Sequence, residues 1–381
     1  MRIGIEAQRI FRKKKHGMDM VALELIKQLQ IIDTVNEYFI FVNNVEDMDV
    51  LPQTNNFTVV QVKASSYPVW EQYYLPKAVK EYQIDVLHCT SNTAPINLNV
   101  PLILTLHDII YLEKWNFTQG TSYQIVGNLY RRWNVPIVVK KAKHIFTVSN
   151  FERDRITSYF KFNQSRVSTA YNGVGKHFAP ITDKDELQRI KKLYNLPDSY
   201  IFFLGNTDPK KNVIGVLKAL SILKQNGQLK SKLLMLDINR DYLLNLMKQI
   251  NDESLMDDIV FSGYVPNKDL PAIYSQASLF LYPSLRESFG IPLLEAMACG
   301  APLITSNTSS MPEIATNAAL FVNPFNANEI ADAIVKLQND VNLQNQLVEN
   351  GFNRVKYFTW ENNAKQTIEL YQSAIKQTFN S

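Results

Sequence analysis

Two glutamates flank an expected helix start in the stretch 284–313, and together they could bind a sugar phosphate. Seven residues separate Glu287 from Glu295, and a tight turn at 289–292 lies between them. Pro292 suits the first position of a helix because its missing N–H costs nothing there, and Gly300 suits the helix end. A helix N-terminus attracts anions, phosphate above all, and carboxylates suit hydroxyl-rich ligands. The spacing therefore favours a ligand that combines a sugar with a diphosphate.

The sequence around this turn resembles a known signature. The run S-F-G-I-P-L-L-E-A-M-A-C-G-A-P resembles the Glu-x7-Glu element of the family-four retaining glycosyltransferases of the GT-B fold. The resemblance implies an α/β protein in which two Rossmann-like, doubly wound domains face a cleft. It implies that Glu287 is catalytic and grips the donor sugar, and that Glu295 holds the ribose hydroxyls. It also implies donor contacts from the backbone of Phe289, Gly290 and Ile291. An ordinary loop–helix–strand unit would explain the apolar pattern, but not the S-F-G-x-P run.

A second segment, from Gly205 to Asn212, follows an expected strand and opens a helix. Lysine near a helix N-terminus suits a diphosphate, because its charge and the free N–H groups act together. The segment resembles the family's G-x-x-x-P-R-K-N element, which implies that Gly205 and Lys211 bind the donor phosphates. Many relatives have an arginine where this chain has Asn206, and we expect Asn206 or Lys210 to take part of that role. Without the resemblance, a solvated pair of lysines at a turn and helix start would explain this segment better than a phosphate site.

Three further candidates lie in the segments that follow expected strands. His107 follows such a strand, and a strand-end residue faces the ligand crevice of an open sheet. A His-Asp pair is more often structural, whereas the resemblance implies that His107 lies near the donor sugar and the reacting carbon. Gly17 lies between the first strand and the first helix, where relatives have a glycine loop that faces the donor phosphate. Val265 follows a later strand, where relatives bind the nucleobase through backbone groups.

Short apolar runs alternate with helical patterns along the chain, which predicts doubly wound parallel sheets. We expect an N-terminal acceptor-binding domain at 1–178, a linker at 179–196 and a nucleotide-sugar-binding domain at 197–360. The resemblance implies that a last helix, at about 361–381, packs back on the first domain. The expected strands are 2–6, 38–42, 58–62, 86–88, 102–106, 144–148, 166–169, 200–204, 232–236, 259–262, 279–282 and 302–305. Besides the helix from Pro292, the expected helices are 19–30, 73–82, 213–224, 243–250, 270–276, 312–315 and 361–379.

Composition and charge limit the class of protein. The 381 residues are 46% apolar, which permits sizeable cores, and no apolar run approaches the ~20 residues of a membrane span. Residues 1–178 carry a net charge of +6 and the remainder −2. A basic first half suits an anionic membrane or a pyrophosphate-bearing acceptor, although a solvated face explains it equally well. Cys89 and Cys299 lack metal-ligand spacing, and no signal peptide is evident. We therefore expect both thiols to be buried and the protein to be cytoplasmic. If the basic first half contacts a membrane, we expect the protein at the inner face of the plasma membrane.

The resemblance is strongest to enzymes of bacterial surface-polysaccharide assembly, many of them mannosyltransferases. It implies transfer of a hexose from a nucleotide sugar, GDP-mannose before UDP-sugars, to a glycan or lipid-diphosphate-linked acceptor. We expect no metal or other cofactor, since no Asp-x-Asp element follows a strand, and no nucleic-acid partner. We favour a front-face route, in which the leaving phosphate takes the acceptor's proton, over a Glu287 nucleophile, because no second carboxylate is placed to act with it. The alternatives are a GT-B nucleotide-sugar epimerase and a catalytically inactive partner subunit.

Overall fold

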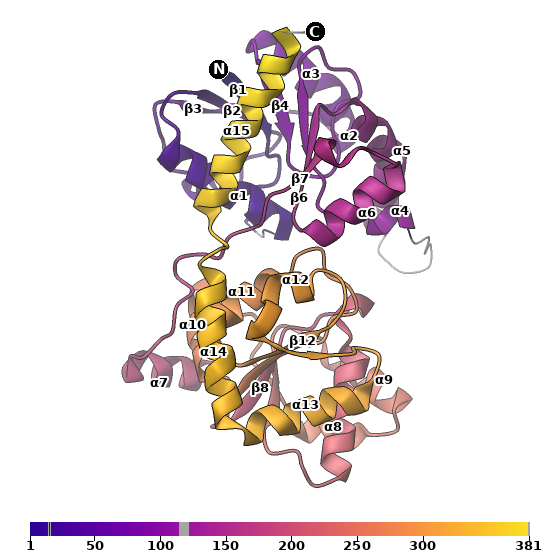
Figure 1. Ribbon diagram of the computed structural model, residues 1–381, viewed down its shortest axis with the longest axis vertical. Helices are drawn as coiled ribbons and strands as arrows, with labels where there is room; N and C mark the ends of the chain where they lie inside the picture. The colour runs from indigo at the N-terminus through magenta and orange to yellow at the C-terminus, as the bar shows by residue number, and fades with distance from the viewer. Residues whose placement is uncertain (14, 16, 114–121, 380–381) are drawn as a thin grey trace. The chain divides into compact units, whose positions relative to one another are not determined.

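The computed structural model describes residues 1–13, 15, 17–113 and 122–379, and the chain divides into two compact units (Figure 1). The first unit comprises Met1–Asn172 and Trp360–Ser381, and the second comprises Gly173–Thr359. Each unit is built on one sheet of parallel strands with helices on both of its faces. This α/β arrangement agrees with the expected doubly wound sheets.

The sheet of the first unit has the strand order β3-β2-β1-β4-β5-β6-β7. Its strands are nearly continuous apolar runs, as expected for parallel strands that are covered on both faces. Their bounds are β1 Arg2–Glu6, β2 Glu37–Val42, β3 Phe57–Gln61, β4 Val86–Cys89, β5 Leu102–Thr105, β6 His144–Thr147 and β7 Val167–Thr169. The helices are α1 Gly17–Ile32, α2 Tyr67–Val69, a π-helical turn Trp70–Tyr74, α3 Leu75–Glu81, α4 Ile110–Glu113, α5 Ser122–Lys141, α6 Asn150–Phe160 and α15 Trp360–Phe379, with short 3₁₀ turns at Met48–Val50 and Gln164–Arg166.

The sheet of the second unit has the strand order β10-β9-β8-β11-β12-β13. Its strands are β8 Tyr200–Phe203, β9 Lys232–Met235, β10 Ile259–Phe261, β11 Leu279–Tyr282, β12 Leu303–Ser306 and β13 Leu320–Val322. Its helices are α7 Lys184–Leu193, α8 Val213–Gln225, α9 Arg240–Gln249, α10 Leu270–Gln276, α11 Ile291–Ala298, α12 Met311–Ala315, α13 Ala327–Asn339 and α14 Val341–Val355, with 3₁₀ turns at Pro209–Lys211, Glu253–Asp258, Asn267–Asp269 and Thr316–Ala318.

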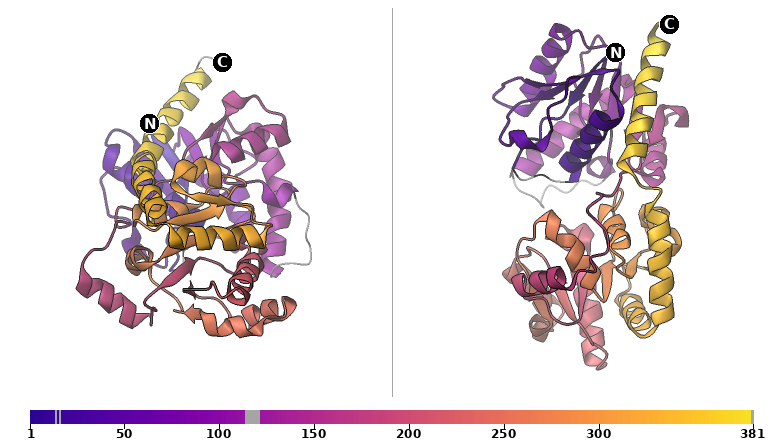
Figure 2. Two further views of the ribbon diagram at one scale, coloured as in Figure 1. Left: turned by 60° about the horizontal axis from the view of Figure 1, so that its bottom comes forward. Right: turned by 90° about the vertical axis from the view of Figure 1, so that its left-hand side faces the viewer.

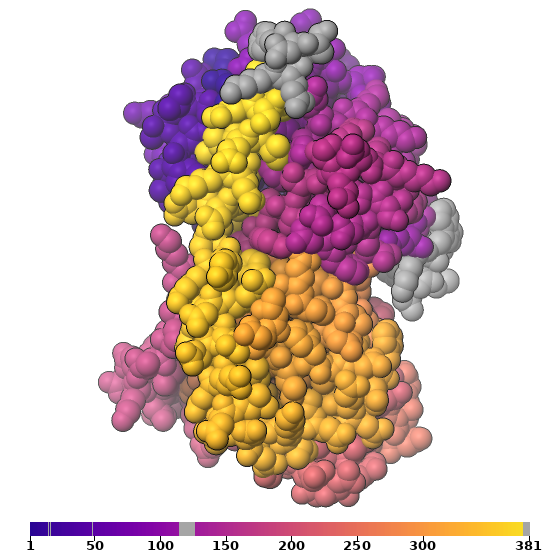
Figure 3. Space-filling model, in the orientation of Figure 1, coloured from indigo at the N-terminus to yellow at the C-terminus, as the bar shows by residue number. Residues whose placement is uncertain are grey.

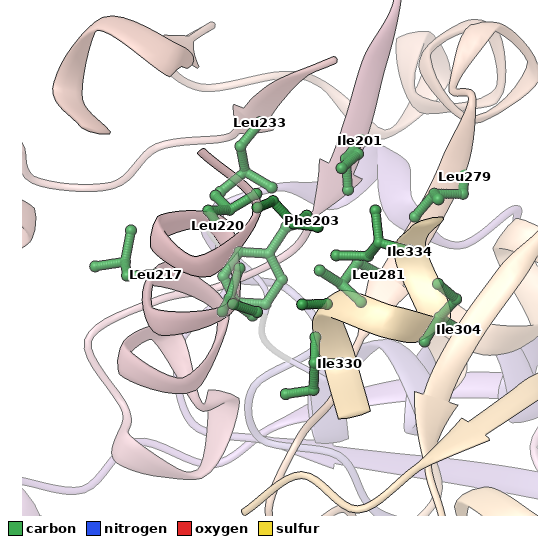
Figure 4. Close-up of a cluster of buried hydrophobic side chains, with 14 of the residues drawn as sticks. Ile201, Phe203, Leu217, Leu220, Leu233, Leu279, Leu281, Ile304, Ile330 and Ile334 are labelled. Atoms are coloured by element: carbon green, nitrogen blue, oxygen red, sulfur yellow. The ribbon is translucent and has the colours of Figure 1, made fainter. Parts of the chain in front are cut away.

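Alternate residues of β8 and β11 supply the cores on the two faces of this sheet. On one face, Ile201 and Leu281 pack with Leu220 of α8 and Ile334 of α13, and all of these side chains are buried (Figure 4). On the other face, the core contains a row of aromatic side chains. Its ring contacts join Phe202, Phe280, Tyr282 and Tyr274, the last from α10.

The last helix, α15, packs beside α1 in the first unit (Figures 2 and 3). Ala364, Tyr371 and Ala374 share a buried cluster with residues of β1 and α1. The Tyr371 hydroxyl lies 2.7 Å from His88 Nδ1, and His88 Nε2 lies 2.7 Å from the Thr105 hydroxyl. Burial lowers the pKa of His88 to about 3, so this residue is a neutral, fully paired imidazole of the core.

Most expected elements agree with the observed ones, but several were missed. Segment 179–196, which we expected to be a linker that runs into a helix, contains α7, and this helix belongs to the second unit. This helix is polar because only Ile190 is buried along it, and Asp183 caps its start. Helices α2, α4, α5, α6, α13 and α14 and strand β13 were not predicted. Cys89 and Cys299 are free and buried, as expected.

Candidate active site

The candidate site of the second unit lies at the carboxyl edge of its sheet, where the strand order reverses between β8 and β11. Ligands of open parallel sheets bind outside the carboxyl ends of the strands at such a reversal. The Gly205 loop follows β8, and the loop that carries Glu287 follows β11. Glycine is required at position 205 by packing, because a Cβ there would lie 2.4 Å from the ring of Phe203.

The two loops are joined by a main-chain contact and by an ion pair. The backbone N–H of Leu285 donates to the carbonyl of Lys210 at 2.7 Å. Lys211 Nζ lies 2.7 Å from Glu287 Oε1, and the two side chains are only 16% and 10% exposed. The structure thus brings together a lysine and a glutamate that are 76 residues apart in the chain.

Tyr282, the last residue of β11, contacts both members of this ion pair. Its hydroxyl accepts a hydrogen bond from Lys211 Nζ at 2.7 Å and donates one to Glu287 Oε1 at 3.0 Å. Burial, and then the nearby Glu287 carboxylate, raise the pKa of Tyr282 well above its usual value, so the hydroxyl stays protonated and keeps its donor role. Sequence reasoning missed this residue, because a tyrosine that ends an apolar strand looks like part of the core.

Hydroxyl side chains of the β12–α12 segment fix the loop that carries Glu287. Ser306 Oγ donates to the carbonyl of Ser284 at 2.6 Å, and Ser310 Oγ donates to the carbonyl of Phe289 at 3.0 Å. The backbone N–H of Glu287 donates to Ser309 Oγ at 3.1 Å. Ser309 has a φ of +52°, a strained conformation that surrounding contacts must maintain. These hydrogen bonds therefore fix the loop that carries the glutamate.

Helix α11 begins directly after this loop. Gly290 forms its N-cap with a φ of +95°, a conformation that favours glycine, and Pro292 occupies the second helical position rather than the expected first. The helix ends with Gly300 in the left-handed conformation just after its C-cap, as predicted. Within the described part of the chain, the N–H groups of Gly290 and Ile291 make no hydrogen bond that would keep them from an anionic ligand.

Glu295 lies in the second turn of α11, where a second buried tyrosine holds it. The Tyr274 hydroxyl donates to Glu295 Oε2 at 2.9 Å. Burial raises the pKa of Glu295 to about 7, and the hydrogen bond from Tyr274 acts in the opposite direction. Glu287 and Glu295 are thus each bonded to a tyrosine of the same aromatic row. Sequence reasoning also missed Tyr274.

His107 belongs to the first unit, in the loop after β5. Its backbone N–H donates to Asn92 Oδ1 at 2.7 Å, and its Nε2 lies 3.0 Å from the carbonyl of Thr90. A carbonyl can only accept, so Nε2 carries the proton. Burial lowers the pKa of His107, which keeps the ring neutral and makes Nδ1 a hydrogen-bond acceptor. A neutral acceptor of this kind suits a sugar hydroxyl.

The sequence of this chain matches two family models. Residues 184–354 match the model of the glycosyl transferases group 1, and residues 41–176 match that of glycosyltransferase family 4. The O-antigen chain mannosyltransferase RfbU of Salmonella typhimurium is 30% identical over 266 residues, which cover 67% of this chain and 68% of that protein. The O-antigen chain mannosyltransferase B of Escherichia coli is 28% identical over 376 residues, covering 93% and 96%.

The chain belongs to the group 1 glycosyltransferases. Solved structures agree with this assignment at the level of the fold. A sucrose-phosphate synthase from Thermosynechococcus elongatus superposes with a TM-score of 0.75 at 20% identity and covers 99% of each chain. Anabaena HepE in complex with UDP superposes with a TM-score of 0.75 at 16% identity, covering 98% of this chain and all of its own. This glycosyltransferase therefore has the GT-B fold.

The remaining predicted site residues of the glycosyltransferase lie as follows. Asn206 Oδ1 accepts a hydrogen bond from the backbone N–H of Asp208 at 2.9 Å, so this side-chain oxygen already has a partner within its own loop. Val265 is buried in the loop after β10, at the same carboxyl edge as β8. Gly17 is the first residue of α1 in the first unit, and a Cβ added there would meet nothing within 4 Å. The functional roles of all these residues stay predictions.

The raised pKa of Glu295 predicts a pH dependence for nucleotide binding by the glycosyltransferase. In the predicted role of Glu295, ribose hydroxyls would donate to the ionised carboxylate. Nucleotide affinity should then rise with pH as Glu295 loses its proton near pH 7, and level off above it. Between pH 6 and pH 8 the affinity should rise about tenfold. The measurement is calorimetric titration with a nucleoside diphosphate. The control is Glu295→Gln, which has no carboxyl proton to lose. The nucleotide's phosphate titrates in the same way with both proteins, so only the difference between them reports on Glu295. An equal slope in both proteins would contradict the role of Glu295.

Proposed function

We propose that this protein is a retaining glycosyltransferase, which moves a hexose from a nucleotide sugar to a glycan or lipid-diphosphate-linked acceptor in cell-surface polysaccharide synthesis. The observation that carries the proposal is the Lys211–Glu287 pair beside the N-terminus of α11. A cation and free N–H groups suit the diphosphate of such a donor, and the two glutamates suit its hydroxyls. The O-antigen mannosyltransferases among its relatives support a mannosyl donor, so GDP-mannose is the first candidate and UDP-sugars are the next.

The chemistry assigns different parts of the step to different residues. The bond between the anomeric carbon and the diphosphate oxygen breaks, and its electron pair leaves with the diphosphate. Lys211 and the N–H groups of Gly290 and Ile291 stabilise the negative charge that grows there. Glu287 stabilises the positive charge on the sugar ring. The acceptor hydroxyl then attacks from the face that the diphosphate leaves, and its proton passes to a leaving phosphate oxygen.

We assign supporting roles to the other predicted residues on the basis of the family resemblance. Neutral His107 accepts a hydrogen bond from a donor-sugar hydroxyl through Nδ1. Gly17 and Gly205 leave room for the phosphates, and the backbone near Val265 contacts the nucleobase. Asn206 and Lys210 take the place of the arginine that many relatives have. No metal or other cofactor enters this scheme, which rests on protein groups alone.

A donor screen tests the proposed function. The purified protein is incubated with GDP-mannose and then with UDP-sugars, with and without a chelator, and both nucleoside diphosphate release and the anomer of the product are measured. We expect one donor to release its nucleoside diphosphate, faster when acceptor is present and at the same rate with the chelator. The product should have the anomeric configuration of the donor. Inversion of the anomer would overturn the retaining mechanism. A new sugar epimer formed without acceptor would indicate an epimerase, and undetectable nucleotide binding would indicate an inactive partner.

We also propose that the first unit contacts an anionic membrane. In the described part of the chain, no helix has the length and apolar character of a membrane span. Helix α5, however, exposes Val126, Leu129 and Trp133 at helical spacing, with exposed fractions of 65%, 47% and 53%. The same helix carries four basic residues and no acidic one. An apolar stripe beside basic side chains suits an anionic lipid surface.

Vesicle sedimentation tests this contact. The wild type should sediment with vesicles that contain phosphatidylglycerol, more than with phosphatidylcholine alone, and high salt should release it. A Leu129→Ser/Trp133→Ser variant should bind at least about tenfold more weakly, because it loses the apolar area that enters the lipid. Leu193→Ser, which changes a residue 56% exposed on α7 of the second unit, is the matched control. Equal sedimentation of all three proteins would contradict the proposal.

A further inference from the structure

Lys211, Glu287 and Tyr282 form a closed ring of hydrogen bonds. Lys211 Nζ donates to the Tyr282 hydroxyl and to Glu287 Oε1, each at 2.7 Å, and the hydroxyl donates to the same Oε1 at 3.0 Å. One carboxylate oxygen thus takes two donors. The other oxygen, Oε2, accepts none within the described residues, so it keeps its acceptor capacity for a ligand hydroxyl.

The ion pair opposes the two roles that the proposed function gives to its members. While Lys211 lies on Glu287, its charge is partly neutralised and is not fully available to a diphosphate. Conversely, the lysine weakens the negative field that Glu287 can exert on a sugar ring. Both side chains are largely buried, so solvent screens this pair only weakly. A donor diphosphate carries more charge than one carboxylate and competes with it for the ammonium group.

We propose that the donor diphosphate draws Lys211 away from Glu287, and that Tyr282 is the positioning residue that then keeps Glu287 in place. This inference rests on the proposed function. When donor binding moves the Lys211 ammonium group to the phosphates, Glu287 is no longer paired with a cation. Its full negative charge can then act on the sugar.

The surroundings of Tyr282 suit such a fixed support. The residue is 1% exposed, and its ring stacks on Phe280 with 5.6 Å between the ring centroids. Its carbonyl accepts a hydrogen bond from Thr305 Oγ1 at 2.9 Å, which ties the end of β11 to β12. Lys211 Nζ lies 4.9 Å from the centre of the Tyr282 ring, on the side of its hydroxyl. A lysine side chain is flexible, whereas this tyrosine is buried and stacked on a neighbouring ring.

Tyr274 provides an internal comparison, because it holds Glu295 as Tyr282 holds Glu287. Both tyrosines are buried and contact Phe280 in one aromatic row. Removal of either hydroxyl deletes one oxygen from the same kind of environment. The expected losses differ, however: Tyr274→Phe should raise the KM for the donor, whereas Tyr282→Phe should lower kcat.

The experiment measures kcat, KM and nucleoside diphosphate affinity for Tyr282→Phe. We expect kcat to fall about 10- to 100-fold, as for loss of a hydrogen bond to a charged group, while affinity stays within about threefold. In a Glu287→Gln background the same change should have little further effect, because both changes remove one function. Tyr200→Phe, which removes a buried hydroxyl bonded to the Ile273 carbonyl, should keep wild-type activity. Wild-type kcat in Tyr282→Phe, or additive losses in the double variant, would overturn the inference.

A crystal soaked with the nucleoside diphosphate that binds best gives the second readout. Lys211 Nζ should have moved from Glu287 Oε1 to a phosphate oxygen, and Glu287 should still accept from Tyr282. A lysine that remains on Glu287 in this complex overturns the inference while leaving the proposed function intact. A wild-type protein that binds no nucleotide and releases none from any donor overturns the proposed function itself.

Discussion

Replacing Glu287 with glutamine is expected to lower kcat by about 10²- to 10³-fold, while nucleoside diphosphate affinity changes by less than about fivefold. Glutamine keeps the shape of the side chain but removes the negative charge that faces the sugar ring as the bond to the diphosphate breaks. The bound nucleotide lies against Lys211 and the start of α11 in the proposed mode, so it loses no contact. Any change in affinity should be a small gain, because the carboxylate no longer competes with the diphosphate for Lys211. Steady-state kinetics and calorimetry on the same preparation measure the two quantities.

The control for this experiment is Glu349→Gln, which removes the charge of an exposed glutamate on α14. It should leave both kcat and affinity unchanged, so a general effect of lost charge can be subtracted. If Glu287→Gln turns over at the wild-type rate, Glu287 has no part in the chemical step. If it fails to bind nucleotide while remaining folded, the glutamate acts in binding instead.

Replacing Lys211 with alanine is expected to weaken nucleoside diphosphate binding by about 10- to 100-fold, because a charge-assisted contact to phosphate is lost. The same change should lower the free energy of unfolding by about 1–3 kcal/mol, since it leaves the buried Glu287 carboxylate without its cation. Calorimetry measures the first effect, and chemical denaturation of the ligand-free protein measures the second.

A second variant separates these two effects. Lys211→Ala combined with Glu287→Gln removes the unpaired charge, so stability should recover while nucleotide affinity stays low. Lys218→Ala, on an exposed position of α8, is the matched control and should bind like the wild type. Wild-type affinity in Lys211→Ala would exclude a phosphate role for this lysine. An unstable double variant would show that the ion pair is not what stabilises the loop.

The sequence predicted the parallel strands well because their signal is local. Apolar runs such as 279–282 have the length and composition of strands buried on both faces, and the structure places β11 at Leu279–Tyr282. The unpredicted β13 has only three residues, two of them partly exposed, so it lacks such a run. Helix α7 was expected to be part of a linker because a helix with one buried residue has a polar composition.

The sequence by itself determined the family and the fold class, and it singled out the two glutamates and the lysine as candidates, because those features are carried by short motifs and local periodicity. The tertiary structure alone decided which groups meet. Lys211 contacts Glu287 only because β8 and β11 are neighbours in the sheet, and no pattern within either segment encodes that contact. The roles of Tyr282, Tyr274 and the serine hydroxyls likewise depend on side chains that converge from separate elements. Short motifs identify residues by their type and their spacing along the chain, whereas the pairing of buried polar groups depends on how distant segments pack.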